Sequence, residues 1–200
     1  SLKNILRNYQ KDGFRWLKTM ANYGFGGILA DDMGIGKTLQ VITLLEDEKL
    51  HDPQAISLVV CPSSLILNWQ SEIAKFSDAL TSILITGNME ERKALIYKAK
   101  DYDVVITSYD YLKRDIEHYE NFHFTYQIID EAQYIKNHNT KNAVSVKQIQ
   151  AAHRFALTGT PIENSLAELW SIFDFLMPGY LYTYPYFKKQ YEIPIVKEND

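Results

Sequence analysis

The chain has little cysteine and no long hydrophobic run. Its one cysteine, Cys61, excludes an internal disulfide, and a position at the end of an apolar segment favours a packing role. No apolar run approaches the roughly 18 residues that a membrane span requires, and no segment has the pattern of a signal peptide. We therefore expect neither secretion nor membrane insertion, but an intracellular protein.

An excess of positive charge is also absent. The chain has 21 Lys and Arg against 25 Asp and Glu, a formal net charge of −4, so it lacks the basic footprint of many nucleic-acid-binding domains. Contacts to phosphates through hydroxyls and backbone amides do not require a basic domain, so nucleic acid is not excluded. The five histidines have no metal-ligand spacing and no set of cysteines beside them. We therefore expect no zinc site.

The length of 200 residues, without a repeat or a linker, suits a single domain with a sizeable core. Apolar segments of strand length alternate with segments of helical periodicity, which is typical of a parallel sheet covered on both faces. The predicted strands are 27–30, 56–61, 82–86, 103–107, 126–130 and 154–158. The predicted helices are 9–22, 37–48, 65–76, 89–100, 109–119, 142–150 and 165–176. The predicted fold class is α/β, with a mostly parallel central sheet.

A Gly-rich turn follows the first predicted strand, and residues 31–38 read DDMGIGKT. Such a turn binds a nucleoside triphosphate because its backbone amides and the start of the next helix face the phosphate oxygens. Lys37 would neutralise the outer phosphates, and the Thr38 hydroxyl would bind Mg²⁺. Asp31 stands where the strict pattern has glycine, so the match is to a relaxed form, and an ordinary tight loop is the alternative. The expected nucleotide contacts of this turn are Gly34, Ile35, Gly36, Lys37 and Thr38.

Two later loops also follow predicted strands. The segment YQIIDEAQ at 126–133 ends in the paired carboxylates Asp130 and Glu131, at the strand end where open α/β sheets bind ligands. Asp130 can hold Mg²⁺ while Glu131 orients and deprotonates the attacking water; a solvated acidic strand end is the alternative. The segment LTGTPIEN at 157–164 is a turn rich in hydroxyls. Alone it would be an ordinary loop, but its distance after Asp130 and Glu131 suggests a sensor that couples nucleotide state to movement. The residues of this sensor would be Thr158, Gly159 and Thr160.

These three segments, in this order, resemble the first ATPase signatures of superfamily 2 helicases, and more narrowly those of the Snf2 family, the Swi2/Snf2 and Rad54-like translocases. Four more segments narrow the match. They are LRNYQKDGFRWL at 6–17, similar to the Q motif; VVCPSSLILNW at 59–69, similar to motif Ia; ITSY at 106–109, similar to motif Ib; and NSLAELWSIFDFLMPG at 164–179, similar to the extended tail of motif III. The resemblance implies a RecA-like P-loop NTPase domain, with residues 1–200 as its first lobe and the second lobe absent from this chain.

The resemblance also implies roles for single residues. Gln10 of the Q motif would contact adenine, and Gln133, where many relatives have His, would couple hydrolysis to the motif III turn. Hydroxyls at two predicted helix starts would contact the DNA backbone, and helix capping alone is the alternative. The residues of this group are Ser63, Ser64, Thr107 and Ser108. The tryptophans Trp16, Trp69 and Trp170 have apolar neighbours at helical spacing, so we expect them in the core rather than in a base-stacking platform.

The function that the resemblance implies is that of a motor, dependent on ATP and Mg²⁺, that moves along double-stranded DNA and displaces or remodels bound proteins. Its implied partners are double-stranded DNA, a second RecA-like lobe of the same polypeptide and DNA-bound proteins. Two alternatives stay open: a helicase that separates DNA or RNA strands, and a nucleotide-binding module without turnover. In this superfamily the arginine finger is on the second lobe, and Arg154, at the start of its predicted strand, is badly placed to replace it. We therefore expect weak ATP binding and almost no hydrolysis by the isolated chain.

Overall fold

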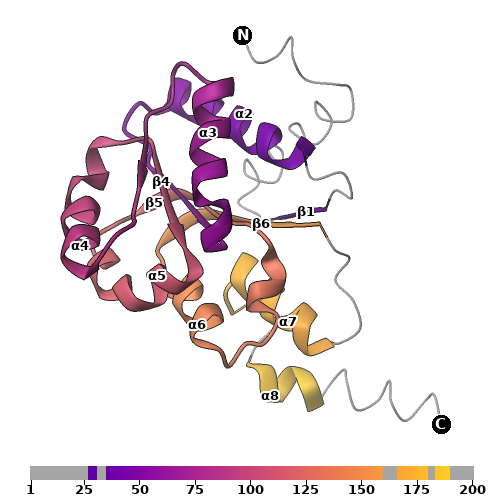
Figure 1. Cartoon of the computed structure of the whole chain (residues 1–200). Helices are drawn as coiled ribbons and strands as arrows, with labels where there is room; N and C mark the ends of the chain where they lie inside the picture. The colour runs from indigo at the N-terminus through magenta and orange to yellow at the C-terminus, as the bar shows by residue number, and fades with distance from the viewer. Residues whose placement is uncertain (1–26, 31–34, 160–165, 180–182, 190–200) are drawn as a thin grey trace.

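The computed structural model describes residues 27–30, 35–159, 166–179 and 183–189 (Figure 1). Its strands form one six-stranded sheet in the order β1-β6-β5-β2-β4-β3. The strands are β1 (Gly27–Ala30), β2 (Ser57–Cys61), β3 (Ser82–Leu84), β4 (Val104–Ser108), β5 (Phe124–Ile129) and β6 (Ala151–Thr158). Neighbouring strands in this sheet are parallel throughout. The predicted α/β class is thus confirmed.

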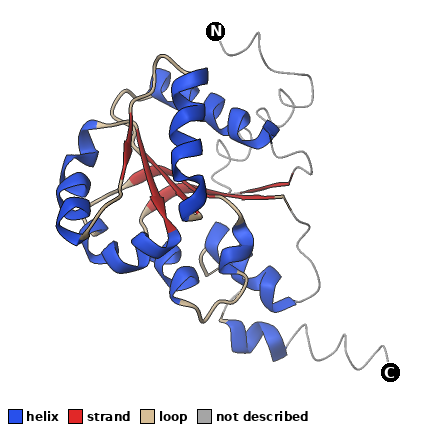
Figure 2. Ribbon diagram, in the orientation of Figure 1, coloured by secondary structure: helices blue, strands red, loops and turns tan. Residues whose placement is uncertain are grey.

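Helices cover both faces of this sheet (Figure 2). They are α2 (Ile35–His51), α3 (Ile66–Phe76), α4 (Met89–Lys98), α5 (Tyr109–Asp115), α6 (Lys141–Gln148), α7 (Leu166–Leu176) and α8 (Tyr184–Phe187). Short 3₁₀ helices are η2 (Ser63–Leu65), η3 (Ala99–Asp101), η4 (Ile116–Tyr119) and η5 (Ala132–Ile135). In the described part of the chain, no helix has the length and apolar character needed to span a bilayer.

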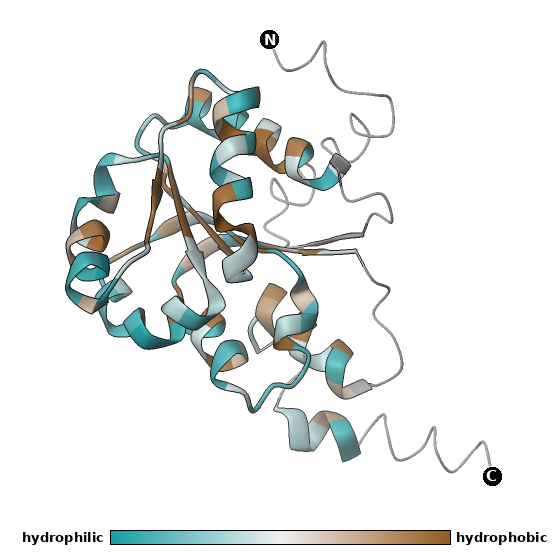
Figure 3. Ribbon diagram, in the orientation of Figure 1, coloured by the Kyte–Doolittle hydropathy of each residue, from teal (hydrophilic) through white to brown (hydrophobic). Residues whose placement is uncertain are grey.

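The core has two layers because successive side chains of a strand point to opposite faces of a sheet. In β2, Val59 and Cys61 belong to the cluster under α2 and α3, whereas Leu58 and Val60 belong to the cluster under α4, α5, α6 and α7. Figure 3 shows the hydrophobic strands between helices whose outer sides are largely hydrophilic. These two sides are the α2–α3 face and the α4–α7 face of the sheet.

Cys61, at the end of β2, is fully buried in the α2–α3 layer. Burial, and secondly the nearby Asp130 carboxylate, raises the pKa of its thiol to about 12. A thiol with this pKa is neutral at physiological pH and is a poor nucleophile. The predicted packing role is therefore supported.

The observed strands agree with the predicted ones except at their ends. The largest difference is β6, which begins at Ala151 rather than at residue 154. Ala151 and His153 pair with Phe124 and Tyr126 of β5. Pairing with β5 thus extends the strand into a segment whose own composition does not predict it, because strand propensity depends on cross-strand partners.

The helices differ more from the prediction. The segment predicted as one helix over 109–119 is α5 followed by η4, and η5 and α8 were not predicted. The predicted helix at 9–22 lies outside the described residues. The remaining predicted helices are present within a few residues of their predicted ends.

Candidate active site

The last residues of the Gly-rich segment belong to α2, which begins at Ile35. Lys37 lies in the first turn of this helix and is 5% exposed, Gly36 is buried and Thr38 is partly buried. An ammonium group beside a helix N-terminus is suited to phosphate, because backbone N–H groups and positive charge act together there. Gly34 lies outside the described residues, as does Gln10, so their predicted contacts remain predictions.

Lys37 lies next to the turn that follows β6. A methyl group added at Gly159 would be 3.6 Å from the Lys37 Nζ atom. The start of α2 and the residues after β6 are close because β1 pairs with β6, with Ala30 opposite Thr158. The structure thus brings Lys37, which is predicted to bind phosphate, close to Gly159 of the predicted coupling turn. Thr160, the last residue predicted for that turn, lies outside the described range.

Asp130 follows β5 and is 8% exposed. Its Oδ2 atom accepts a hydrogen bond from Trp69 Nε1 (2.9 Å), and its Oδ1 atom accepts one from the backbone N–H of Glu131 (2.9 Å). Burial raises the pKa of this carboxyl, and these two hydrogen bonds, with the charge of Lys37, act in the opposite direction. Asp130 is therefore a buried, oriented carboxylate close enough to Lys37 for their charges to interact.

The oxygen atoms present fit a magnesium ion. Mg²⁺ prefers oxygen ligands and is usually held by one or two side chains together with phosphates and water. Asp130 and Thr38 are of that kind, and a buried carboxylate is a group that a nearby cation stabilises. Among the described residues, no three His, Cys, Asp or Glu side chains gather as a self-contained metal site. A magnesium ion here would therefore take most of its ligands from a nucleotide and water.

Glu131 has a left-handed backbone conformation, with φ 53° and ψ 58°. It is the one non-glycine residue with positive φ in the described ranges. This conformation costs about 1–2 kcal/mol for a residue with a side chain, and such strain is concentrated at functional sites. Its carboxylate accepts a hydrogen bond from Gln133 Nε2 at 2.6 Å. The acidic pair is thus a constrained turn rather than a loose strand end.

Gln133 lies in η5, one residue after the buried Ala132. While its Nε2 atom binds Glu131, its Oε1 atom is buried with no hydrogen-bond partner. A buried acceptor without a donor is uncommon and needs an explanation. Contact between Gln133 and the turn at 158–160 stays a prediction.

The four hydroxyls predicted to contact DNA divide into two pairs. Ser63 and Ser64 are exposed in η2, directly after β2. Thr107 and Ser108 are buried at the end of β4, and the Ser108 hydroxyl accepts the Tyr111 backbone N–H (3.0 Å). Ser108 is therefore the N-cap of α5. Its contact with nucleic acid, like that of the other three, stays a prediction.

Two residues that form hydrogen bonds to Asp130 were not identified from the sequence. We call Asp130 and Glu131 the acidic turn. Trp69 is 1% exposed, so its predicted core position is confirmed, as is that of Trp170. Its indole N–H, however, is bonded to Asp130. Tyr109 donates its hydroxyl proton to the backbone carbonyl of Asp130 (2.7 Å). A buried Trp or Tyr needs a partner for its polar atom, but the sequence does not say which one.

The arginines in the described part are engaged away from this turn. Arg92 binds Asp115 and Arg114 lies near Asp110. Arg154 donates to the backbone carbonyl of Ile149 (2.9 Å). Since β6 begins at Ala151, Arg154 lies inside the strand rather than at its start, but it is still well before the carboxyl end.

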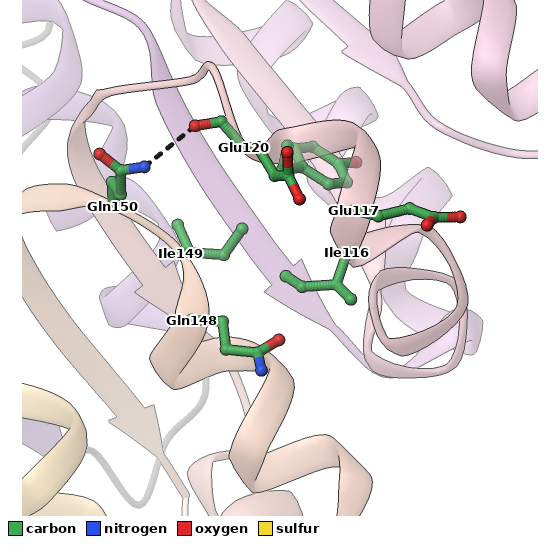
Figure 4. A pocket seen from close by; sticks show the side chains of 7 residues that line it. Ile116, Glu117, Glu120, Gln148, Ile149 and Gln150 are labelled. Carbon is green, nitrogen blue, oxygen red and sulfur yellow. Dashed lines mark hydrogen bonds between the residues drawn. The ribbon is translucent and has the colours of Figure 1, made fainter.

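A hollow of about 290 Å³ lies between η4 and the end of α6 (Figure 4). Gln150 donates to the backbone carbonyl of Glu120 (3.0 Å) at one side of it. These residues precede β6 and β5, so the hollow is at the amino ends of the strands, where open α/β sheets do not gather their ligands. Two carboxylates, Glu117 and Glu120, line it and would repel phosphate. We therefore do not assign the nucleotide to this hollow.

Comparison with known proteins gives consistent matches. The family model of the SNF2-related domain matches residues 9–200. TATA-binding protein-associated factor 172 of Homo sapiens is 42% identical over 98% of this chain, and an uncharacterized ATP-dependent helicase of Mycoplasma genitalium is 42% identical over 94% of it. This chain spans 11% and 18% of the lengths of these two relatives.

A solved structure is also similar. The Sulfolobus solfataricus SWI2/SNF2 ATPase core in complex with dsDNA has a TM-score of 0.87 and 45% sequence identity. The match covers 96% of this chain and 40% of that one. The RecA-like fold that the sequence implied is thus confirmed.

Proposed function

Because the chain belongs to the SNF2-related domain family, we propose that it is the first, ATP-binding lobe of a double-stranded DNA translocase of helicase superfamily 2. The intact protein would hydrolyse ATP to ADP and phosphate, move along DNA and displace or remodel bound protein. The observation that carries this proposal is the meeting of Lys37, the Gly159 turn and the Asp130 turn at the carboxyl edge of β1, β6 and β5.

Each residue at this edge has a proposed task. Lys37 and the amides at the start of α2 bind the phosphates, and Gln10 contacts adenine. Thr38 and Asp130 supply oxygen ligands to Mg²⁺, which neutralises charge on the phosphates when bound. Glu131 orients the attacking water and accepts its proton. Gln133 holds the Glu131 carboxylate through its 2.6 Å hydrogen bond.

The proposed DNA contacts lie on the other half of the same edge, after β2 and β4. Exposed Ser63 and Ser64 are available at the surface, whereas buried Thr107 and Ser108 could contribute only through backbone atoms or after a local movement. Hydroxyl contacts suit a chain with net charge −4. The similarity to an ATPase core solved with dsDNA supports this assignment.

A second RecA-like lobe of the same polypeptide would complete the site. An arginine finger stabilises charge in the transition state and accelerates hydrolysis by a factor of about 10³–10⁵. The described arginines are bound elsewhere. We propose that the finger comes from the second lobe, and that the intact protein acts inside the cell, where DNA and ATP are available.

The test is steady-state ATP hydrolysis by the intact protein that contains this chain. Blunt duplex DNA, single-stranded DNA and duplex RNA are titrated separately, with a Glu131→Gln variant as control. Strong stimulation by duplex DNA alone, abolished in Glu131→Gln, is the expected result.

A strand-separating helicase is the second candidate, since one similar protein is named an ATP-dependent helicase. Stimulation by single strands or RNA as strong as that by duplex DNA would replace the translocase with this function. Tight ATP binding without hydrolysis under every condition would support the third candidate, a nucleotide-binding module.

A further inference from the structure

Two hydrogen bonds hold Asp130 from opposite faces of the sheet. Trp69 belongs to α3, on the α2–α3 face, and its Nε1–H donates to Oδ2 of Asp130 (2.9 Å). Tyr109 begins α5, on the α4–α7 face, and its hydroxyl donates to the backbone carbonyl of Asp130 (2.7 Å). One bond fixes the side chain and the other fixes the main chain.

Both donors are shielded from water. Trp69 is 1% exposed and Tyr109 is 2% exposed. The Tyr109 ring stacks on that of Tyr134, with centroids 5.1 Å apart and planes 8° from parallel. A hydrogen bond in such surroundings is electrostatically stronger than one in water, and its loss leaves a buried group without a partner. These two bonds therefore restrict the position of Asp130 strongly.

Tyr109 also acts on Glu131, because the carbonyl that it binds belongs to the peptide between Asp130 and Glu131. Fixing that peptide plane supports the left-handed conformation of Glu131. Both donors bond to Asp130 and would act on the reaction through it. Trp69 and Tyr109 are therefore positioning residues for the acidic pair.

Each donor also belongs to a helix that starts at a proposed DNA loop. α3 directly follows η2, which carries the exposed Ser63 and Ser64. Tyr109 is the first residue of α5, immediately after Ser108. Since β2 lies between β5 and β4 in the sheet, both helix starts are at the same edge as Asp130. A shift of either loop would move a donor of Asp130.

We propose that Trp69 and Tyr109 transmit contact with duplex DNA at these two loops to the metal-binding Asp130 and the base Glu131. The inference rests on the proposed function, which it deepens. Binding of DNA and binding of the divalent cation are then coupled, and such a coupling must be reciprocal.

The coupling is measured in the intact protein with Mn²⁺, which prefers the same oxygen ligands as Mg²⁺. Electron paramagnetic resonance gives the Mn²⁺ dissociation constant in the presence of ADP, with and without blunt duplex DNA. The variants are Trp69→Phe, which removes the indole N–H, and Tyr109→Phe, which removes one hydroxyl. Tyr126→Phe is the matched control, because its hydroxyl bonds to Glu48 (3.3 Å) rather than to the acidic turn.

We expect DNA to tighten Mn²⁺ binding by about fivefold or more in the wild type and in Tyr126→Phe. Each of the two test variants should reduce this factor to less than about twofold. DNA affinity without nucleotide, measured by fluorescence anisotropy, should be unchanged. Both donors act on Asp130. The coupling free energy lost in the double variant should therefore be no more than the sum of the losses in the single variants, and less than that sum if the two residues act as a unit.

Two outcomes would overturn the inference: an unchanged coupling factor in both test variants, or no coupling in the wild type. Melting temperatures identify a variant that has lost its fold. If Trp69→Phe does not fold, Tyr109→Phe, which deletes a single oxygen, tests the inference alone. The proposed function is tested separately by the DNA-stimulated hydrolysis of the wild type. If that stimulation is present and the coupling is not, only the present inference fails.

Discussion

At the scale of single residues, Glu131 combines a proposed catalytic role with an unfavourable backbone conformation. Its φ of 53° is disfavoured for a side chain of this size. The neighbouring peptide is held by Tyr109, and the carboxylate is held by Gln133. The surrounding structure thus maintains a conformation that the residue itself would not choose.

This strain makes a prediction about stability. Glu131→Asn should raise the free energy of unfolding by about 0.5–1 kcal/mol relative to Glu131→Gln, because Asn adopts left-handed conformations more readily. Both variants should lose ATP hydrolysis, since neither side chain can accept the proton. Urea unfolding of the two variants, with hydrolysis measured in parallel, checks this. Equal stability of the two would show that the conformation is not strained.

The candidate residues Lys37, Asp130 and Glu131 could be chosen from the chain, because they are in local patterns whose residue types match the chemistry of phosphate and Mg²⁺; their roles stay predictions. The bonds from Trp69 and Tyr109 to Asp130 could not be predicted. They depend on which strands are neighbours, and β2 and β5 are far apart in the sequence.

At the scale of elements, α4 and α5 are joined by a buried ion pair. Arg92 donates from Nε to Oδ2 of Asp115 (2.8 Å) and from Nη2 to Oδ1 (2.9 Å). The hydrogen bond to Asp115 is the main cause of the raised pKa of Arg92, against the effect of burial. A bidentate pair of this kind fixes the relative position of the two helices.

Removing one partner of this pair should therefore destabilise the domain. Asp115→Ala leaves a buried guanidinium without its carboxylate and should cost about 3–5 kcal/mol. The double variant Arg92→Met, Asp115→Leu removes both charges and should cost much less, because apolar replacement of a whole buried pair is often nearly neutral. Urea unfolding of both variants measures the difference, and similar losses in the two would contradict this account.

The start of α4 gives a second prediction at this scale. Gly87 has φ 102°, and a methyl group there would overlap Oε2 of Glu91, which accepts the Asn88 backbone N–H in the capping box. Gly87→Ala should cost about 2 kcal/mol through strain and a disturbed cap. Gly179→Ala is the matched control, since Gly179 has φ 80° but open space around it.

The melting temperatures of these two variants should differ, with Gly87→Ala the lower. The control carries only the conformational cost, about 1 kcal/mol. A loss in Gly179→Ala as large as that in Gly87→Ala would mean that the contact with Glu91 is unimportant.

The elements themselves show where local pattern is sufficient. Each of the six strands was placed from its apolar run, because a buried parallel strand is hydrophobic on both sides. The amino end of β6 and the short helix η5 were not placed. The first depends on pairing with β5, and the second follows from the left-handed turn at Glu131.

At the scale of the whole molecule, the described residues include the acidic pair and Lys37, the proposed phosphate ligand, while the described arginines are engaged elsewhere. Residues 1–200 alone should therefore hydrolyse ATP about 10³-fold or more slowly than the intact protein stimulated by duplex DNA. Phosphate release by both proteins, at equal concentration and saturating ATP, measures the ratio. Comparable rates would show that the first lobe supplies its own arginine.

The pairing of β1 with β6 also affects when the proposed nucleotide site can form. Among the described strands β1 pairs with β6, with Gly27 opposite Phe155, so β1 has no partner there until β6 has been synthesised. At about 5–20 residues per second, that delay on the ribosome is roughly 6–25 seconds. The sheet from β2 to β5 can assemble during this time. On a nascent chain, the proposed phosphate-binding site is therefore expected to form after the central strands of the sheet.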